Sequence, residues 1–309
     1  MSELQHAKSS LGIPPESRSL EERLKYGIVV VDKPEGPSSH EVSAFVRKIL
    51  HIGVTGHTGT LDQNVSGVLV VLLEHSRKVV NFIPNTDKTY VCLMKISGKR
   101  NREELESAFS NFRGEIYQRP PLQSAVAKKL RTRKVHSLEI LEVRENLVLF
   151  ECKCEAGTYI RKIVSDAAEV LGVKAEMAEL RRTQAGDFSE KDAISLQALS
   201  DYYFLWKEKG QESYLKNAIK PIESLKIPRM VLSDGAAKKI RHGVKPRVSE
   251  VVSLDGNISR FGKIGLFTHS GELIAMGEAL LSSSEIKSNA EADQFDEPVC
   301  RISRVIHEF

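Results

Sequence analysis

The stretch YGIVVVDKPEGPSSHEVSAFVRKIL, residues 26–50, decides the fold class, because a strand pattern and a helix pattern meet in it. Its first part, GIVVVDKP, is rich in β-branched residues and ends at Pro34, which cannot donate to a central sheet ladder. Ser38 and Glu41 form a capping-box pattern, and apolar residues then recur at helical spacing. We therefore expect a short buried strand followed directly by an amphipathic helix.

Outward from this unit, strand patterns outnumber helix patterns as far as about residue 226. Further strands are expected within residues 67–73, 89–97, 136–143 and 147–156, and helices within residues 103–112 and 157–172. Regular alternation of strands and helices, which is typical of a parallel sheet, is rare in this order. The predicted architecture is α+β, with a mixed or antiparallel central sheet and flanking helices.

The chain divides into three parts by composition. Residues 1–25 are polar and lack the apolar centre of a signal peptide, so we expect a partly disordered arm. Residues 26–226 carry the strands and helices of the main domain. Residues 227–309 contain short strands separated by glycines, which predict a small β-barrel-like second domain. Within that domain, the acidic and polar residues 282–298 are expected to form a mobile loop.

The composition excludes several classes of protein. The 309 residues are 41% hydrophobic and 28% charged, which is ordinary for a soluble globular protein, and no apolar run approaches the length of a membrane span. The four cysteines show neither CxxC nor paired Cys/His spacing, so we expect no metal site. Because no export signal is visible, we expect a reducing, cytoplasmic location.

Positive charge is mild overall, with a net charge of +4, but it is concentrated in KKLRTRK, residues 128–134. The charged side chains of this run are Lys128, Lys129, Arg131, Arg133 and Lys134. A solvated surface is one interpretation of such a run, and a phosphate-binding surface is the other. The run alone does not decide between them.

The turn-rich segment GHTGTLDQNVSG, residues 56–67, holds a single carboxylate, Asp62. An aspartate in such a segment commonly stabilises a turn, because its side chain bonds to nearby backbone N–H groups. From the segment alone, this structural interpretation is favoured over a reactive carboxylate. The rest of the chain has to decide between the two.

Several segments together, in their order along the chain, resemble the TruB/dyskerin family of RNA pseudouridine synthases. These segments are YGIVVVDKPEGPSSH, GHTGTLDQNVSGVL, KTYV, QRPPLQSAV, LRTRKVHSLEILE, GTYIRKIVSDAAEVLG and ELRRTQAGDF. The resemblance extends from about residue 26 to the C-terminus, where the last part is similar to a PUA domain, a small RNA-binding barrel. The uninterrupted PUA-like part and LRTRKVHSLEILE favour the archaeal/dyskerin branch of the family.

The resemblance implies an enzyme that isomerises uridine to pseudouridine in rRNA and tRNA. The archaeal branch supplies the catalytic subunit of box H/ACA particles, so a guide RNA and small accessory proteins are implied as partners. The reaction detaches uracil from the ribose and joins C5 to C1′, which is redox-neutral and adds no atoms, so no cofactor or metal is expected. Two alternatives stay open: a stand-alone enzyme acting on the tRNA T-loop, and a non-catalytic RNA-binding scaffold.

The resemblance also assigns roles to single residues. Asp62 takes the place of the catalytic aspartate, and Arg161 that of the arginine paired with it, in a site that we expect to be partly buried. Tyr90 corresponds to the tyrosine that stacks on the target base, Leu180 to an apolar pocket residue, and His57 to a residue near the flipped nucleotide. Without the resemblance, these would be a turn aspartate, a surface arginine, a strand aromatic, a core leucine and a solvated histidine.

Supporting and RNA-binding residues follow from the same resemblance. Lys33 and Pro34 match a motif beneath the catalytic loop and are given a structural role. The basic run 128–134 matches the neighbourhood of a mobile loop that closes over RNA, and phosphate or guide-RNA contacts in the PUA-like part are expected at Lys238, Lys239, Arg241 and Lys245. The sequence departs from the family pattern at Gln63, Ser66, Glu176 and the C-terminal VCRISRVIHEF, none of which is an implied catalytic group.

Overall fold

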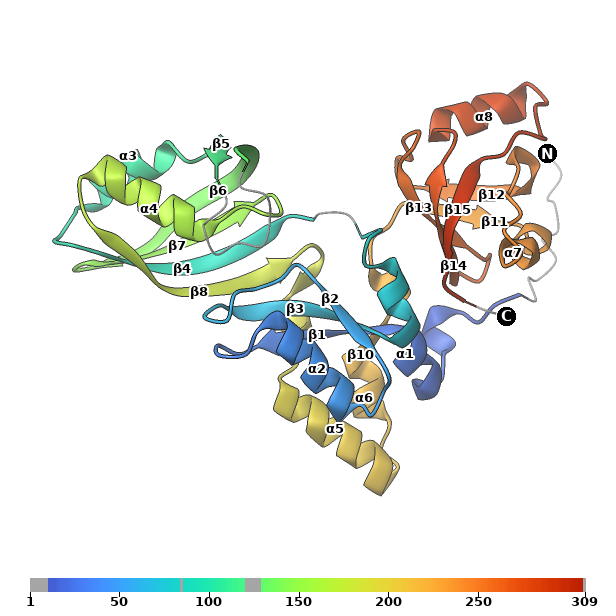
Figure 1. Cartoon of the computed structure of the whole chain (residues 1–309), viewed down its shortest axis with the longest axis horizontal. Coiled ribbons are helices and arrows are strands. Elements are labelled where there is room, and N and C mark those ends of the chain that lie inside the picture. Colours follow the sequence, from blue (N-terminus) through green and yellow to red (C-terminus); the bar gives the residue numbers. More distant parts are fainter. Residues whose placement is uncertain (1–10, 84–85, 120–128, 308–309) are drawn as a thin grey trace, which may run out of the picture.

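The computed structural model describes residues 11–83, 86–119 and 129–307, which form two sheets with their helices (Figure 1). The larger sheet contains β1 (Gly27–Lys33), β2 (Thr55–Thr58), β3 (Ser66–Leu73), β4 (Lys88–Ile96), β5 (Gly114–Gln118), β6 (Arg131–Arg144), β7 (Leu147–Cys154), β8 (Ala175–Ala185), β9 (Phe188–Ser189) and β10 (Ile219–Pro221). Its helices are α1 (Leu20–Tyr26), α2 (Ser39–Ile49), α3 (Arg102–Ser110), α4 (Ile160–Leu171), α5 (Leu196–Lys209) and α6 (Ser213–Ala218).

The smaller sheet belongs to the C-terminal part of the chain. Its strands are β11 (Arg229–Leu232), β12 (Val251–Asp255), β13 (Lys263–Phe267), β14 (Leu273–Ala279) and β15 (Cys300–Val305), with helices α7 (Asp234–Ile240) and α8 (Ser283–Glu291). Short 3-10 turns lie at Pro15–Ser17, Glu74–Val79, Glu190–Asp192, Ile222–Ser224 and Val248–Glu250 (η1 to η5). The predicted α+β class with a β-rich second part is confirmed.

Both sheets are mixed. The larger has the order β10-β1-β3-β8-β4-β7-β6-β5, with β2 beside β3 and β9 beside β8. Only the short β3–β8 contact is parallel among these pairs, and it joins the two halves of the sheet. The smaller has the order β12-β11-β13-β14-β15, with a parallel β11–β13 pair. The candidate site lies over this β3–β8 junction.

Local signals explain where the helices around the site begin and end. The Ser38 side chain accepts a hydrogen bond from the Glu41 backbone N–H, and the Glu41 carboxylate accepts one from the Ser38 backbone N–H. The helix α2 therefore begins with the predicted capping box. The helix α4 ends at Gly172, whose φ of 62° is left-handed and favours glycine. These two helices therefore lie where the sequence placed them.

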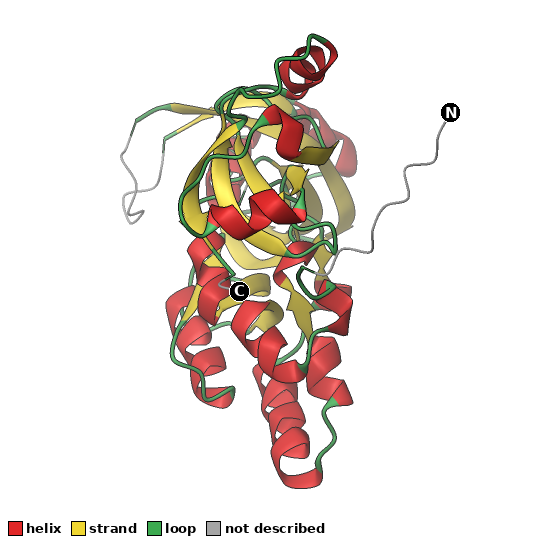
Figure 2. Cartoon of the chain, turned by 90° about the vertical axis from the view of Figure 1, so that its right-hand side faces the viewer, coloured by secondary structure: helices red, strands yellow, loops and turns green. Residues whose placement is uncertain are grey.

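Helices cover different halves of the larger sheet (Figures 1 and 2). Near β4 and β7, α3 and α4 pack on one face, and Phe109 of α3 meets Phe150 of β7 edge to face with ring centroids 5.1 Å apart. Near β1 and β3, the helices α2, α5 and α6 pack around a second apolar cluster that includes Val46 and Leu199. The strands between these two clusters carry the candidate site.

The prediction of a partly disordered arm before Tyr26 is wrong for residues 11–25. Residues 1–10 lie outside the described part of the chain. Residues 11–25 contain η1 and most of α1, and Leu20 and Arg18 are buried. Full burial of a leucine side chain stabilises a fold by about 1.5–3 kcal/mol relative to an exposed one. Leu11 packs against the core of the C-terminal sheet, so this segment connects the two parts of the molecule.

The acidic segment 282–298 also differs from its prediction as a mobile loop. Ser282 and Glu285 form a capping box, and α8 follows, with Ile286 buried in the core of the C-terminal part. Ile286 is the one buried residue of α8, so its acidic and polar sequence resembles that of a loop. In the described ranges of the chain, we find no helix that is both long and apolar enough to span a membrane.

Candidate active site

Asp62 lies in the loop between β2 and β3, and the loop is fixed by bonds on both sides of the aspartate. The Ser39 hydroxyl accepts a hydrogen bond from the Leu61 N–H at 2.8 Å and donates to the Leu61 carbonyl at 2.9 Å. The Asp62 carbonyl accepts from the Val65 N–H at 3.2 Å, and the Gln63 carbonyl accepts from the Gly36 N–H at 2.9 Å. The backbone of the loop is thus held without using the Asp62 carboxylate.

Lys33 holds the same loop from beneath. Its side chain is fully buried, and its ammonium group donates to the carbonyls of Pro34 at 2.9 Å, Gln63 at 3.2 Å and Val65 at 2.7 Å. Burial lowers the pKa of Lys33, while the nearby Glu35 and Asp62 carboxylates act in the opposite direction. These three bonds hold the backbone of the loop on both sides of Gln63.

The carboxylate of Asp62 projects to Arg161, the second residue of α4. The Arg161 Nη2 and Asp62 Oδ2 atoms are 2.9 Å apart, so the expected pairing is present. The expected partial burial is wrong, because the Asp62 side chain is 64% exposed and that of Arg161 41% exposed. Both side chains are therefore accessible to the solvent from which a nucleotide would arrive.

Tyr90 is tied to the loop by an arginine that the sequence interpretation missed. Arg182 is buried, and it donates to the Gly59 carbonyl at 2.7 Å and to the Val68 carbonyl at 2.8 Å. Tyr90 lies opposite Arg182 in the β4–β8 register, so the guanidinium acts electrostatically on the phenol. Burial raises the pKa of Tyr90, although Arg182 partly offsets the shift, so its phenol is protonated at neutral pH.

A glycine allows β8 to approach this loop. Gly67 at the start of β3 has a φ of +107°, and a Cβ there would lie 2.2 Å from the Arg182 carbonyl oxygen. Any larger residue would therefore push β8, and Arg182 with it, away from the loop. The signal for Arg182 in the sequence was only its place after Leu180 and Arg181 in ELRR, which does not distinguish a buried arginine from an exposed one.

Leu180 and His57 lie on two other strands around the loop. Leu180 of β8 is opposite Cys92 and packs against the apolar cluster beneath α4; it also lines a cavity of about 340 Å³ with Asn64 and Ser66. His57 of β2 is half-buried, and burial lowers its pKa, with further lowering by His40 and Arg182. His57 is therefore a neutral side chain near the site.

The basic run does not form one loop. Lys128 lies outside the described residues, Lys129 is exposed, and Arg131, Arg133 and Lys134 lie on β6. The Arg133 guanidinium lies 3.3 Å from where a Cβ would stand at Gly157, just before α4. The run is thus strand from Arg131 onward, and the position of Arg133 near the N-terminus of α4 places positive charge beside the candidate site.

The expected contacts of the C-terminal part are on the surface. Lys238 and Lys239 are exposed on α7, and Arg241 and Lys245 are exposed in the segment that follows it. Lys239 is 3.2 Å from Glu250, which partly neutralises it. Within the described ranges, no group of three or more His, Cys, Asp or Glu side chains is arranged to hold a metal ion.

Comparison with known families accounts for almost the whole chain. The profile of the TruB family pseudouridylate synthase N-terminal domain matches residues 47–104 and 95–160, and that of the tRNA pseudouridylate synthase B C-terminal domain matches residues 161–226. A DKCLD domain matches residues 2–43, and a PUA domain matches residues 228–292. The chain belongs to the TruB family of pseudouridine synthases.

Two similar proteins come from archaea. The chain is 45% identical over 90% of its length to a probable tRNA pseudouridine synthase B of Archaeoglobus fulgidus, covering 86% of that protein. It is 46% identical over 89% of its length to the protein of the same name from Methanocaldococcus jannaschii, covering 82% of it. The TruB-family chain is thus an RNA-modifying isomerase with a PUA domain.

Solved structures agree with the whole arrangement of the TruB-family chain. A chain in the crystal structure of a Cbf5-Nop10-Gar1 complex matches with a TM-score of 0.89 and 40% identity, covering 96% of this chain and 90% of that one. A chain in the structure of an H/ACA RNP bound to a substrate RNA containing 2′-deoxyuridine matches with a TM-score of 0.89 and 37% identity, covering 98% and 93%. The likeness includes both sheets.

Proposed function

We propose that this TruB-family enzyme is the catalytic subunit of a guide-RNA particle that converts uridine to pseudouridine in rRNA and tRNA. The observation that carries the proposal is the match over both sheets to a chain of a Cbf5-Nop10-Gar1 complex and to a chain of an H/ACA RNP bound to a substrate RNA. A guide RNA and small accessory proteins are proposed as its partners, and the cytoplasm as its location.

The site supports this chemistry through residues with separate tasks. The open Asp62 carboxylate is the proposed catalytic group, placed to act at C1′ of the ribose or at the base, and Arg161 orients it. The protonated phenol of Tyr90, held by Arg182, is the proposed partner of the flipped uracil and of proton transfer at C5. Leu180 and His57 border the same region.

Uridine must leave its stack before C1′ and C5 become accessible, which costs a few kcal/mol unless the RNA is already held open. A guide RNA that pairs with both sides of the target would hold the uridine unpaired. The solvent-exposed ion pair of this chain is consistent with a site that the RNA and its partners complete.

Release of tritium from RNA labelled at C5 of uridine tests the proposal. The enzyme is assayed with a guide–target pair and with unmodified tRNA, each with and without the small accessory proteins. We expect turnover of the target in the presence of its guide RNA, increased by the accessory proteins. Equal turnover of the target without any guide RNA would contradict the proposed particle.

A stand-alone tRNA synthase is the second candidate, because the similar archaeal proteins are named probable tRNA pseudouridine synthase B. Efficient modification of tRNA by the enzyme alone would favour it. A non-catalytic scaffold is the least supported candidate, since Asp62, Arg161 and Tyr90 are all present and the first two are paired. The absence of tritium release under every condition would support the scaffold.

A further inference from the structure

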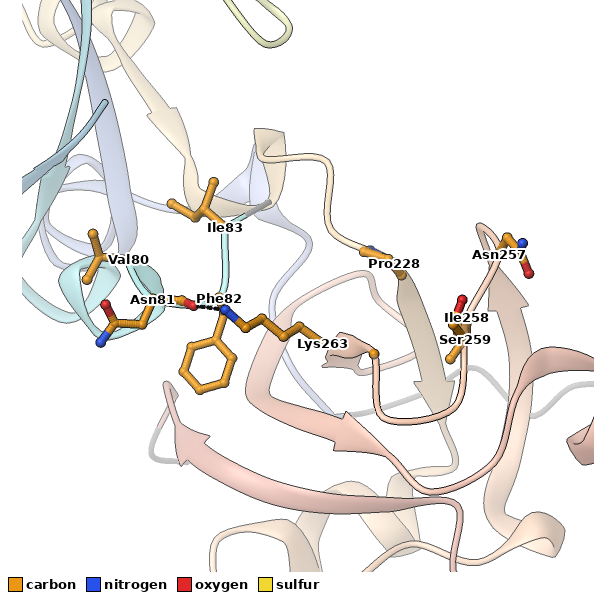
Figure 3. A pocket seen from close by; sticks show the side chains of 10 residues that line it. Val80, Asn81, Phe82, Ile83, Pro228, Asn257, Ile258, Ser259 and Lys263 are labelled. Atoms are coloured by element: carbon orange, nitrogen blue, oxygen red, sulfur yellow. Dashed lines mark hydrogen bonds between the residues drawn. The ribbon is translucent and has the colours of Figure 1, made fainter. Parts of the chain in front are cut away.

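A cavity of about 530 Å³ lies between the two parts of the molecule (Figure 3), and none of its lining residues belongs to the candidate active site. One wall comes from the segment after η2, and the other from the C-terminal part at the turn between β12 and β13. The lining residues are Val80, Asn81, Phe82, Ile83, Pro228, Asn257, Ile258, Ser259, Gly262 and Lys263. Nothing in the chemistry described above uses this cavity.

The two walls are held in place by contacts that cross the junction. Ile28 of β1 and Met276 of β14 belong to one continuous buried apolar cluster. Lys78 of η2 donates to the Val305 carbonyl of β15 at 3.3 Å. The Lys263 ammonium group donates to the Asn81 carbonyl across the cavity, as Figure 3 shows. The cavity is therefore preformed, and its size is within the range of small-ligand pockets.

The lining favours an aromatic, anionic ligand. The Phe82 ring is half-buried, and its centroid is 6.0 Å from the Lys263 ammonium nitrogen. Asn257 and Ser259 add exposed amide and hydroxyl groups. No carboxylate stands among the lining residues, so the positive charge of Lys263 is not cancelled inside the cavity. A ring for stacking, a cation and side chains that both donate and accept are what an unpaired nucleotide requires.

The turn that supplies Ser259 and Lys263 also presents Phe261 to solvent. This side chain is 65% exposed, and its φ of 64° is left-handed, which is an outlier for a bulky residue. The Phe261 N–H donates to the Ala279 carbonyl at 2.7 Å, which holds the turn in this conformation. The Arg260 guanidinium carbon lies 5.5 Å from the ring centroid. An aromatic ring is thus displayed beside the cavity, next to an arginine whose Nη1 is also 3.2 Å from the Glu285 carboxylate.

We propose that this junction cavity binds an unpaired nucleotide of the RNA held by the enzyme. The base stacks on Phe82, Lys263 and Arg260 contact the phosphates, and Phe261 stacks a neighbouring base outside the cavity. The proposal rests on the proposed function, because it takes the bound RNA as its ligand. It adds a second contact for that RNA, separate from Asp62 and from the basic residues around α7.

Binding of a fluorescein-labelled guide RNA and of a single-stranded oligonucleotide tests the proposal, with Phe82→Ala, Phe261→Ala, Lys263→Gln and Lys263→Arg. The matched controls are Phe295→Ala, which removes another exposed aromatic of the C-terminal part, and Lys287→Gln, which removes an exposed charge on α8. We expect roughly five- to tenfold weaker binding for each phenylalanine variant, as for loss of one stacked base. The controls should bind as the unsubstituted enzyme does.

Lys263 also bonds across the junction, so its variants need a second measurement. Lys263→Gln should reduce the salt dependence of binding by about the contribution of one phosphate, and Lys263→Arg should restore it. A photoreactive 5-iodouridine placed in the single-stranded part should crosslink to Phe82 or Phe261. Unchanged affinity in all four variants, or crosslinks only to other residues, would overturn the proposal.

The outcome is independent of the test of function. A preparation without any pseudouridine formation would reject the proposed function, but its RNA binding and crosslinks would still accept or reject this site.

Discussion

Two ionic clusters of this enzyme have opposite environments. Asp62 and Arg161 are 64% and 41% exposed, and the structure joins them by a single contact of 2.9 Å. Arg18, by contrast, is buried between Glu223 and Glu272, whose side chains are 5% and 1% exposed. The comparison separates two uses of charge: the buried cluster holds parts of the chain together, and the open pair is left available for a substrate.

The geometry of the buried cluster explains why it is structural. The two terminal nitrogens of Arg18 contact the two oxygens of Glu223 at 2.9 and 2.8 Å, and one of them also contacts Glu272 at 3.0 Å. Glu223 further accepts from the Leu273 N–H at 2.9 Å. Such a planar, bidentate arrangement satisfies the donors that burial would otherwise leave without partners. Three parts of the sequence meet in it.

The largest effect is expected at the open pair. Asp62→Asn keeps the size of the side chain and its loop bonds, which are made by backbone atoms, but removes the carboxylate. We expect pseudouridine formation to fall on the order of 10⁴-fold or more, as for loss of an essential catalytic group. Thermal unfolding and RNA affinity should change little. Substantial tritium release by this folded variant would exclude Asp62 as the catalytic group.

Substitutions in the buried cluster are expected to lower the stability of the fold. Arg18→Ala leaves two carboxylates buried without their counter-ion, so we expect the free energy of unfolding to fall by about 3–5 kcal/mol in urea titrations. A combined Arg18→Met, Glu223→Gln and Glu272→Leu variant, which removes all three charges, should recover most of the loss. A loss below about 1 kcal/mol for Arg18→Ala would place this cluster with ordinary surface pairs.

Substitution of Lys33 tests whether support of the loop can be separated from the catalytic role of Asp62. Lys33→Met removes a buried donor and leaves the Gln63 and Val65 carbonyls with one bond fewer, at a cost of about 1–3 kcal/mol. We expect a reduced single-turnover rate with unchanged RNA affinity, because the loop and not the binding surface is loosened. An unchanged rate together with lower stability would limit Lys33 to a purely structural role.

Arg161 should behave in the opposite way to Arg18. Because the pair is exposed, Arg161→Ala should change the free energy of unfolding by less than about 1 kcal/mol. Its effect should appear in the single-turnover rate, and Arg161→Lys should restore it poorly, since lysine lacks the planar fork that orients a carboxylate. Near-normal rates for both variants would make Arg161 an ordinary surface residue.

The smallest effect concerns pH. The pKa of His57 is lowered in the folded enzyme by burial, His40 and Arg182, so folding favours its neutral form. Its stabilising contribution is present above the ordinary histidine pKa of about 6.5 and is lost as the pH falls below that value. Melting temperatures of His57→Gln should therefore decline less on acidification than those of the unsubstituted enzyme. His242→Gln, at an exposed histidine, is the control, and parallel curves for all three proteins would refute this assignment.

Local chemistry was predictable from the sequence, and contacts between distant segments were not. The capping box of Ser38 and the end of α4 at Gly172 depend on neighbouring residues, so both can be recognised from a few consecutive residues of the sequence. Arg161 and Asp62, 99 residues apart, were brought together only by the resemblance to a family. Arg182 was missed because burial of an arginine depends on Gly59 and Val68, which lie on another strand and loop.

The same reason explains the error at the N-terminal segment. Residues 11–25 are polar, and nothing near them in the sequence indicates that Arg18 has a partner. Its partners Glu223 and Glu272 lie 205 and 254 residues further along the chain. The helix α8 was missed for a different reason, since its capping box at Ser282 and Glu285 was readable but its acidic surroundings resemble a loop.

The position of Arg18 sets an order of events during synthesis on the ribosome. A chain grows at about 5–20 residues per second, so roughly 10–50 s pass between the emergence of Arg18 and that of Glu272. For most of this interval β1 also lacks β10 as its neighbour, and Arg18 lacks both of its carboxylate partners. The segment around Arg18 therefore completes its contacts only after Glu272 of the C-terminal part has been translated.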